Sequence, residues 1–324
     1  MQATQVHLET TGGPEVLRLR QVDLAAPGPG EILVQHEAIG LNFIDTYHRN
    51  GLYPVELPAP LGVEAAGTVI AAGDGVTHLA AGDRVGTFGP LRGAYASVRL
   101  APASSYFRLP ADVDCRTAAA MLLKGCTVEF LAERAAHPQA GDWVLLHAAA
   151  GGVGQLLAQW LTALGVRVIG TVGNVAKEAV ARAAGCEIVL PADTPDLAEQ
   201  VRAASGGGVR VVYDGVGAAT WQVSLASCAR RGLIVSFGNA SGPVSGVNLG
   251  VLAAHGSLFV TRPTIYDYYV TPEDRAAGLD RLWAMWRQGA VKTTIGQTFP
   301  LTDVAAAHRA LEARETTGST LLLP

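Results

Sequence analysis

Apolar residues follow two different patterns along the chain, one before about residue 110 and another from Asp142 onward. In the first part, short apolar runs alternate with turns rich in Gly and Pro, which predicts a β-rich barrel domain. In the second part, strand-like apolar runs alternate with helical segments, which is typical of a parallel, doubly wound sheet. The segments after residue 272 do not continue this alternation, so we expect them to return to the first domain.

The expected elements follow from these patterns. In the first part the strands are Ala3–Leu8, Val16–Gln21, Glu31–Gly40, Gly67–Ala72, Arg84–Thr87 and Tyr95–Leu100. Two helical segments, Cys115–Leu123 and Thr127–Ala135, are expected on either side of Gly125. Further helices are expected at about 175–184, 195–204, 219–229, 272–288 and 301–313, with strands at 187–190, 209–214, 233–237, 257–261 and 319–323.

The stretch from Val144 to Thr171 predicts a strand, a tight turn, a helix and a second strand. The turn reads Ala149-Ala150-Gly151-Gly152-Val153-Gly154, and its three glycines allow a ligand to approach the backbone closely. Unpaired N–H groups and the dipole at the helix start favour an anion there. We therefore predict a dinucleotide pyrophosphate site formed by Ala150, Gly151, Gly152 and Val153.

Two alternatives compete with this interpretation. The turn could connect strand and helix without binding a ligand, since Ala149 replaces the first glycine of the usual motif. A membrane span is the second alternative, because no charged residue occurs between Asp142 and Arg167. The glycine cluster and the sharp division into strand and helix favour the dinucleotide unit over a span.

The end of the second strand of this unit indicates which dinucleotide binds. NAD-binding units usually place an acid there for the ribose 2′-hydroxyl, but this chain reads Thr171-Val172-Gly173-Asn174. Lys177 follows one helical turn later, although a lone lysine is also a common solvated residue. We predict that Gly173, Asn174 and Lys177 receive a 2′-phosphate, so that NADPH is preferred over NADH.

Composition limits the remaining classes of function. The 324 residues are enough for two domains, and 49% hydrophobic with 16% charged residues suits a compact α/β protein. The formal net charge of −4 and the absence of a Lys/Arg run do not favour binding to nucleic acid or to an anionic membrane. The four cysteines lie far apart, and no signal or transit peptide is evident, so we expect reduced thiols and a cytoplasmic protein.

Several motifs in both halves resemble a known family. They are Gly40-Leu41-Asn42-Phe43-Ile44-Asp45-Thr46-Tyr47, Gly51-Leu52-Tyr53-Pro54, Leu61-Gly62-Val63-Glu64-Ala65-Ala66-Gly67, Gly82-Asp83-Arg84-Val85, the glycine turn, Val211-Val212-Tyr213-Asp214-Gly215-Val216-Gly217, Ser236-Phe237-Gly238-Asn239 and Val260-Thr261-Arg262-Pro263. Together they resemble the medium-chain dehydrogenases/reductases, and within them the zinc-free quinone oxidoreductases related to zeta-crystallin. The resemblance covers essentially the whole chain.

The resemblance implies a fold and an assembly. We expect a GroES-like β-barrel catalytic domain built from residues 1–124 and 262–324, with a Rossmann NADPH-binding domain, residues 125–261, inserted between them. Cofactor and substrate would lie in the cleft between the two domains. The resemblance also implies a homodimer joined through the Rossmann domain near Val247–Thr261.

Zinc-dependent relatives carry a Cys near the position of Asn42 and a His at that of Val63. Neither an asparagine amide nor a valine replaces those zinc ligands, and the cysteine-rich lobe of a structural zinc is absent. We therefore predict no metal. Without a Lewis acid, oxidation of a simple alcohol is hard, whereas a quinone needs positioning more than acid catalysis.

The resemblance also implies roles for single residues. Asn42 and Tyr47 would lie beside the nicotinamide and the substrate carbonyl, where each can donate a hydrogen bond, and Tyr53 would line the mouth of the site. Each has a structural alternative: Asn42 as a helix cap, and the two tyrosines as wall residues. Further cofactor contacts would come from Asn42, Thr127, Phe237, Asn239, Arg262 and Arg314. Glu64 would anchor backbone, and Pro191 stands where relatives often place a tyrosine near the 2′-phosphate.

The predicted function is thus NADPH-dependent reduction of a small quinone at a metal-free site. An NADPH-dependent reductase of enones or alkenals is the nearest alternative, because it uses the same fold and cofactor. A non-catalytic role, structural or in RNA binding, is a third alternative. The acidic balance and the lack of a basic patch with aromatic residues do not favour RNA.

Overall fold

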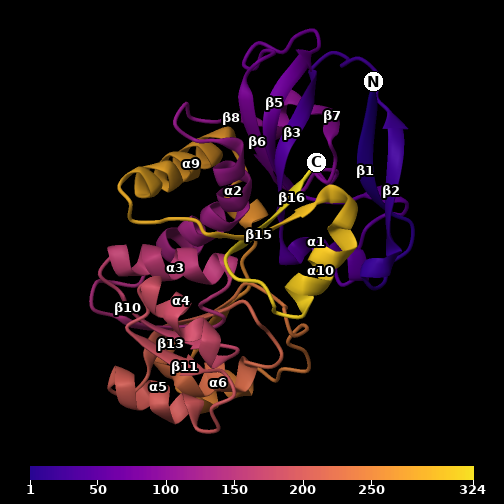
Figure 1. Ribbon diagram of the computed structural model, residues 1–324. Coiled ribbons are helices and arrows are strands. Elements are labelled where there is room, and N and C mark those ends of the chain that lie inside the picture. Colours follow the sequence, from indigo (N-terminus) through magenta and orange to yellow (C-terminus); the bar gives the residue numbers. More distant parts are fainter. The chain divides into compact units, whose positions relative to one another are not determined.

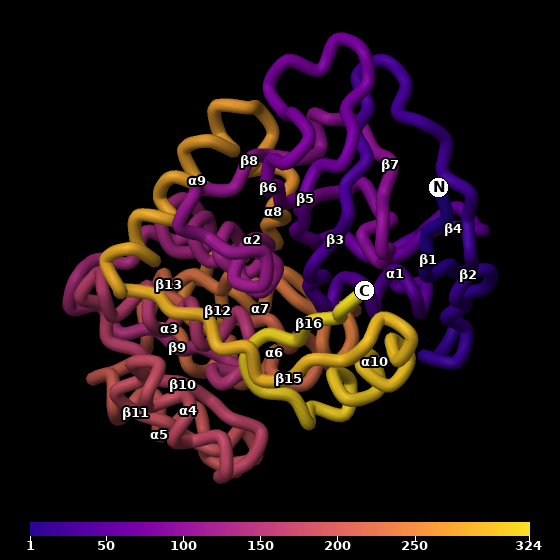
Figure 2. Tube along the Cα trace, turned by 45° about the horizontal axis from the view of Figure 1, so that its top comes forward, coloured from indigo at the N-terminus to yellow at the C-terminus, as the bar shows by residue number.

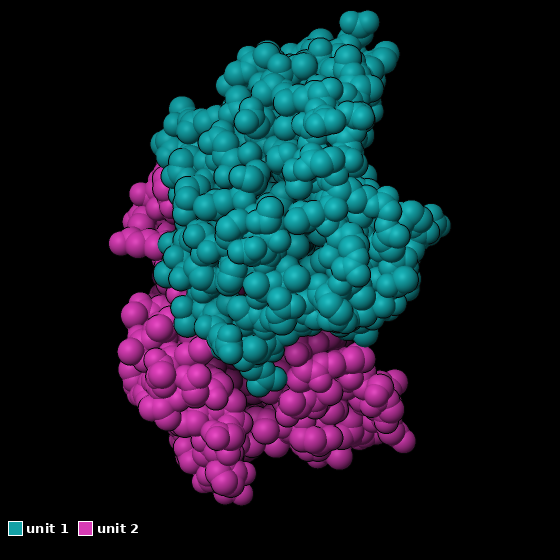
Figure 3. All heavy atoms as spheres, turned by 45° about the vertical axis from the view of Figure 1, so that its right-hand side comes forward, with its two compact units in different colours: residues 1–123, 293–324 teal, residues 124–292 magenta.

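The computed structural model describes all residues 1–324 and divides them into two compact units (Figure 3). Unit 1 comprises residues 1–123 and 293–324, and unit 2 comprises residues 124–292. The chain passes from unit 1 to unit 2 between Leu123 and Lys124. The chain returns to unit 1 only at Thr293, whereas the expected domain boundary lies at residue 262, so residues 262–292 pack with the nucleotide-type unit.

Unit 1 is built from two β-sheets that join both ends of the chain. A three-stranded sheet has the order β2 (Leu17–Asp23), β1 (Gln2–Leu8), β4 (Ala59–Pro60). The larger sheet runs β15 (Ile295–Pro300), β16 (Ser319–Leu323), β3 (Glu31–Leu41), β5 (Glu64–Ala72), β6 (Arg84–Phe88), β8 (Phe107–Arg108), and β7 (Val98–Pro102) also pairs with β3. Figure 2 shows β16 beside β3, where Leu321 pairs with Gly40 in antiparallel register.

Two helices of unit 1 position its candidate residues. α1 (Phe43–Asn50) follows β3 directly and ends at Gly51 in the left-handed conformation, which favours glycine. α10 (Val304–Glu312) lies between β15 and β16 in sequence and packs on both strands. The core beneath them gathers residues from both chain ends, among them Val6, Leu8, Ile39, Val304 and Leu322.

Unit 2 contains a six-stranded parallel sheet with the order β11-β10-β9-β12-β13-β14. Strands β10, β11 and β13 of this sheet can be followed in Figure 1. The strands are β9 (Trp143–Leu146), β10 (Arg167–Val172), β11 (Ile188–Pro191), β12 (Val209–Asp214), β13 (Cys228–Ser236) and β14 (Phe259–Thr261). The order reverses between β9 and β12, as in doubly wound folds whose ligands bind at the carboxyl ends of the strands. The predicted sheet is therefore confirmed.

Helices cover both faces of this sheet. α3 (Gly152–Ala163) packs with α4 (Glu178–Ala183), and α5 (Leu197–Ser205) packs with α6 (Trp221–Ser227). Three more helices follow: α7 (Gly250–Ala254), α8 (Ile265–Tyr268) and α9 (Pro272–Arg287). The start of α9 is fixed by a capping box in which Thr271 and Asp274 satisfy each other's backbone N–H groups.

One helix differs from the sequence prediction. α2 (Cys115–Glu129) continues through Gly125 without a break, and a π-helical segment, Phe130–Ala136, extends it. Gly125 has a packing role, because a Cβ there would lie 2.5 Å from Leu282 Cδ1 of α9. The glycine therefore allows two helices to approach closely and does not mark a turn.

None of the helices combines the length and the apolar character that a membrane-crossing helix needs. The four cysteines, Cys115, Cys126, Cys186 and Cys228, are buried and form no disulfide.

Candidate active site

The glycine turn connects β9 to α3 in a strained conformation. Ala148 has a φ of +54°, which is unfavourable for a residue with a Cβ. The turn is held in place because Ala149 N donates to Thr171 O at 2.9 Å and the buried Gln155 side chain donates to Ala150 O at 2.8 Å. Strain of this kind concentrates at functional sites, where surrounding contacts hold it.

The glycines of the turn differ in what the fold requires of them. A Cβ on Gly154 would lie 2.3 Å from Ala148 O, so the packing of helix on strand excludes a side chain there. A Cβ on Gly151 would lie 3.3 Å from the same oxygen, and its φ of −75° is ordinary for any residue. The packing therefore excludes a side chain at 154, whereas at 151 a Cβ would be tight against a single backbone oxygen.

The segment after β10 leaves open space at its glycine. Gly173 has no heavy atom within 4 Å of its notional Cβ and no positive φ, so the fold does not require glycine there. Gly173 and Asn174 are exposed, and Lys177 is half-buried in the short 3₁₀ turn that precedes α4. The structure thus brings these three predicted residues together beside the glycine turn, whose Ala149 is bonded to Thr171 of β10. Pro191, at the end of β11, pairs with Val172 and supplies no hydroxyl.

A buried polar chain below the turn was not predicted from the sequence. Thr171 Oγ1 lies 3.1 Å from His147 Nδ1, and His147 Nε2 lies 3.2 Å from Ser224 Oγ. Ser224 donates its hydroxyl proton to Asp214 Oδ2 at 2.8 Å, so His147 Nε2 carries a hydrogen and Nδ1 accepts from Thr171. Burial lowers the pKa of His147, which keeps the ring neutral.

Asp214 anchors the next loop. Its Oδ1 atom accepts hydrogen bonds from the N–H groups of Val216 and Gly217, both at 2.9 Å. The chain from Thr171 to Asp214 therefore ties together the carboxyl ends of β9, β10 and β12. An acid at the end of a buried strand, followed by Gly-x-Gly, is the signal that could have identified it.

The carboxyl end of β13 gathers three further predicted residues. Arg262 Nη1 donates to Ser236 O at 2.7 Å. With the Asn239 amide turned so that both of its polar atoms find partners, Arg262 Nη2 donates to the Asn239 side-chain oxygen at 2.9 Å. Phe237 packs against Gly215, where a Cβ would lie 2.8 Å from the phenyl ring. Thr127 is half-buried on α2 of the same unit, whereas Arg314 belongs to unit 1 and is exposed after α10.

In unit 1, Asn42 occupies the N-cap position of α1, as the structural alternative expected, but its side chain has another partner. Asn42 Nδ2 donates to Glu64 Oε2 at 2.8 Å and makes a longer contact of 3.4 Å with Gly40 O. Glu64 Oε1 accepts from Leu123 N at 2.6 Å, so this buried carboxylate joins β5 to α2, as the anchoring role predicts. A Cβ on Gly40 would lie 2.1 Å from Glu64 Oε2, which explains the glycine.

The predicted tyrosines lie together after Asn42. The Tyr47 and Tyr53 rings are 5.2 Å apart in an edge-to-face arrangement, and Tyr53 N donates to Tyr47 O at 3.0 Å. Tyr47 is 7% exposed and Tyr53 is half-buried, which suits wall residues. Their roles in catalysis stay predictions.

A second buried chain supports α1 and was also missed. Arg49 donates to His308 Nδ1 at 3.3 Å, which requires the hydrogen of that ring to be on Nε2, 3.3 Å from Tyr95 Oη. Tyr95 donates to Asp45 Oδ2 at 2.9 Å, and the same oxygen accepts from Asn42 N at 3.0 Å. The chain brings together segments more than 200 residues apart, which sequence pattern alone does not reveal.

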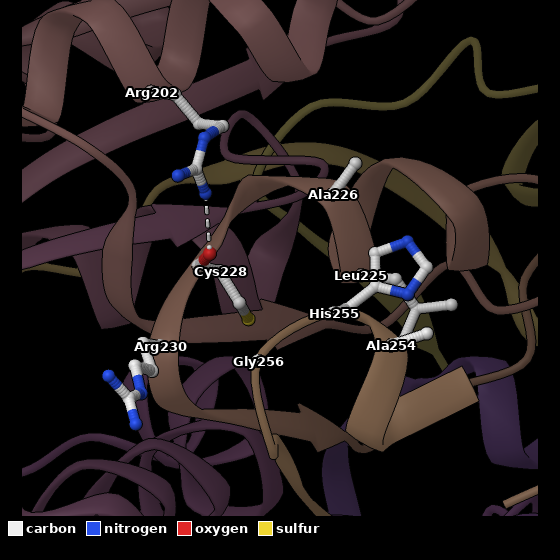
Figure 4. A pocket seen from close by; sticks show the side chains of 8 residues that line it. All are labelled: Arg202, Leu225, Ala226, Cys228, Arg230, Ala254, His255 and Gly256. Atoms are coloured by element: carbon white, nitrogen blue, oxygen red, sulfur yellow. Dashed lines mark hydrogen bonds between the residues drawn. The ribbon is translucent and has the colours of Figure 1, made fainter. Parts of the chain in front are cut away.

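Residues that could bind a metal are not gathered anywhere in the chain: no group of three or more His, Cys, Asp or Glu has suitable geometry. One surface cavity of about 410 Å³ is lined by Arg202, Cys228, Arg230 and His255, among others (Figure 4). It lies where β13 begins, at the amino ends of the strands, and so at the opposite end of the sheet from the glycine turn.

Comparison with known proteins identifies the family. Residues 28–111 match the model for the alcohol dehydrogenase GroES-like domain, and residues 152–282 match the model for zinc-binding dehydrogenases. A quinone oxidoreductase of Pseudomonas aeruginosa is 47% identical over 99% of this chain and 100% of its own length. The chain belongs to the quinone oxidoreductase family of medium-chain dehydrogenases/reductases. The predicted combination of a GroES-like domain with a Rossmann domain is thereby confirmed.

Two further relatives of this oxidoreductase bear on its chemistry. The crystal structure of Escherichia coli quinone oxidoreductase complexed with NADPH matches with a TM-score of 0.96 at 46% identity, covering 99% of this chain and 100% of that one. A 2-haloacrylate reductase from Burkholderia sp. is 40% identical over 97% of this chain and 96% of its own length.

Proposed function

We propose that this protein is an NADPH-dependent reductase of small quinones. The observation that carries the proposal is Gly173, a glycine directly after β10 that the fold does not require, together with Gly151 at the start of α3, where a Cβ would meet only Ala148 O, at 3.3 Å. Close approach of a cofactor to the backbone would explain both glycines. The lack of an acid between Thr171 and Lys177 supports NADPH over NADH. The names of the relatives support a quinone as the acceptor.

The residues of unit 2 would hold the cofactor. N–H groups at the start of α3, from Gly151 to Val153, would bind the pyrophosphate, and Gly173, Asn174 and Lys177 would bind the 2′-phosphate. Thr127, Phe237, Asn239, Arg262 and, from unit 1, Arg314 complete the proposed set of contacts. NADPH, when bound, supplies a hydride.

The residues of unit 1 would orient the quinone. Asn42 has one N–H engaged by Glu64, so the proposed donor to a reduced quinone oxygen is its second N–H, which makes only the 3.4 Å contact with Gly40. The Tyr47 hydroxyl would donate a second hydrogen bond or a proton, and Tyr53 would exclude water. No zinc ligand set is part of this proposal, and elemental analysis of the purified protein tests it.

A second candidate function is reduction of α,β-unsaturated carbonyl compounds, which the identity to a 2-haloacrylate reductase favours. Both functions are tested by following NADPH absorbance with 1,4-benzoquinone, phenanthrenequinone and an enone, each repeated with NADH. Fast quinone reduction with NADPH and slow reduction with NADH supports the proposal. Turnover of the enone alone assigns the second function, and no turnover with any of them contradicts both.

We also propose that the protein is a homodimer that acts in the cytoplasm. β14 is the last strand of its sheet and exposes Phe259 (62%) and Val260 (40%), while Leu249 nearby is 76% exposed. An unpaired edge with large apolar side chains favours pairing with a second copy. Buried cysteines without disulfides suit a reducing compartment.

A further inference from the structure

The loop at residues 89–93, between β6 and β7, is surrounded by polar atoms that lack hydrogen-bond partners. His48 Nδ1, Arg92 Nε and Arg99 Nη1 are all buried and unpartnered. Buried polar atoms in native proteins are nearly always paired, so three such atoms near one loop call for an explanation. All three residues belong to unit 1.

Two of these residues are arginines without a carboxylate partner. Arg99 is 3% exposed, and its Nη2 atom donates only to the carbonyl oxygens of Leu91 and Arg92, at 2.9 and 2.7 Å. Arg99 thereby holds the loop from below, with its guanidinium 5.8 Å from the centre of the Tyr106 ring. Arg92 is half-buried and forms no ion pair. Unpaired positive charge at a partly buried position is costly unless an anion compensates for it.

His48 connects this loop to the proposed substrate site. It lies on α1 directly after Tyr47, and its ring centre is 6.1 Å from that of Tyr53. Burial, and then the charge of Arg92, lower the pKa of His48 to about 4, so the ring is neutral at pH 7. Arg92 therefore supplies the positive charge near this ring, and His48 Nδ1 supplies an additional hydrogen-bonding atom.

We propose that Arg92 and His48 form a subsite for an anionic substituent of the substrate, beside Tyr47 and Tyr53. The substrate class is then quinones or enones that carry a carboxylate or a similar anion, and these are reduced in preference to neutral analogues. Arg92 binds the anion, His48 offers a hydrogen bond, and Arg99 positions the loop that carries Arg92. This inference rests on the proposed function and narrows its substrate.

A matched pair of substrates tests the subsite: a benzoquinone that carries a propionate side chain, and its methyl ester, each with saturating NADPH. In the unaltered protein we expect a KM at least about tenfold lower for the acid than for the ester, as for one charge-assisted hydrogen bond. Arg92→Leu is expected to remove most of this difference, Arg92→Lys to restore part of it, and His48→Phe to weaken it. The KM for NADPH is expected to stay unchanged in Arg92→Leu, because Arg92 is not among the proposed cofactor contacts.

Arg116→Leu is the control, since Arg116 is an exposed arginine of the same unit at the start of α2. Equal KM values for acid and ester in the unaltered protein, or the same change for both in Arg92→Leu, would overturn the subsite while leaving quinone reduction intact. If neither quinone is reduced, the proposed function is contradicted. Calorimetric binding of the acid still decides the subsite in that case, because it must weaken in Arg92→Leu but not in Arg116→Leu.

Discussion

Asn42 Nδ2 donates to Glu64 Oε2 across 2.8 Å, which fixes the orientation of the Asn42 amide before any substrate binds. The carboxylate is itself held by the N–H of Leu123 at 2.6 Å and is fully buried. One N–H of the amide thus donates to Glu64, and the proposed donor to a substrate oxygen is the other N–H, whose contact with Gly40 O is longer, at 3.4 Å. Orientation set in advance is what makes a hydrogen bond effective in a transition state.

Removing this donor tests its role. Asn42→Ala is expected to lower kcat for 1,4-benzoquinone by about 10- to 100-fold, the value of one hydrogen bond to developing charge. Glu64→Gln is expected to lower kcat as well, because a glutamine cannot accept from both Asn42 and Leu123 with two oxygens. Steady-state kinetics measure kcat for these two variants and for Tyr47→Phe, which lacks only the tyrosine hydroxyl. Full turnover in both Asn42→Ala and Tyr47→Phe would show that the assigned chemical roles are wrong.

Two glycines of one turn give opposite expectations. Gly154→Ala places a Cβ 2.3 Å from Ala148 O, so we expect a marked loss of thermal stability. Gly151→Ala meets the same oxygen at 3.3 Å with an ordinary φ, so thermal stability should fall less than in Gly154→Ala, while the Kd for NADPH rises at least tenfold. Melting temperatures with and without NADPH separate the two effects. If Gly151→Ala binds NADPH with unchanged affinity, the pyrophosphate does not bind at this turn.

Lys177 tests the preference for NADPH. Lys177→Ala is expected to raise the KM for NADPH about tenfold and to leave that for NADH unchanged, because only the 2′-phosphate loses a charged partner. Lys292→Ala, in the same unit, serves as the control. If the KM values for NADPH and NADH rise equally in Lys177→Ala, Lys177 does not act through the 2′-phosphate.

Stability should decline in mild acid because of buried neutral histidines. His36 accepts at Nε2 from Tyr106 at 2.7 Å and donates from Nδ1 to Ala96 O at 2.8 Å, and burial lowers its pKa to about 3. The unfolded chain binds a proton near pH 6.5 and the folded ring does not, so stability is full above pH 6.5 and is lost toward pH 3. The loss from this one residue is about 1.4 kcal/mol per pH unit.

Urea unfolding at pH 6.5 and 4.5 measures this effect. His36→Gln removes the titrating ring, so the difference in unfolding free energy between the two pH values should shrink by about 2–3 kcal/mol relative to the unaltered protein. Because only the difference between the two pH values is compared, any destabilisation that does not depend on pH cancels. His137→Gln, at an exposed histidine, is the control and should leave the slope as it was.

The sequence patterns predicted those features whose causes are local. Neighbouring residues in the chain determine the strands of the parallel sheet, the glycine turn between strand and helix, and the conformation of the residues after β10. The continuous helix through Gly125 depends on Leu282, and the return to unit 1 at Thr293 depends on how α9 packs. The chain Arg49–His308–Tyr95–Asp45 needs residues from both ends of the sequence, so no spacing rule reveals it.

The exposed edge of unit 2 carries the prediction about assembly. Val260 lies on β14, whose only pairing partner in the chain is β13, and is 40% exposed. Val260→Lys adds a charge to this edge, and lysine on an edge strand opposes pairing with a second copy, so we expect a shift from dimer to monomer. Sedimentation velocity measures the shift. Leu19→Lys, at a residue 43% exposed on β2, is the matched control and should leave the dimer intact. A protein that sediments as a monomer without any substitution, or a dimer that survives Val260→Lys, would contradict pairing through β14.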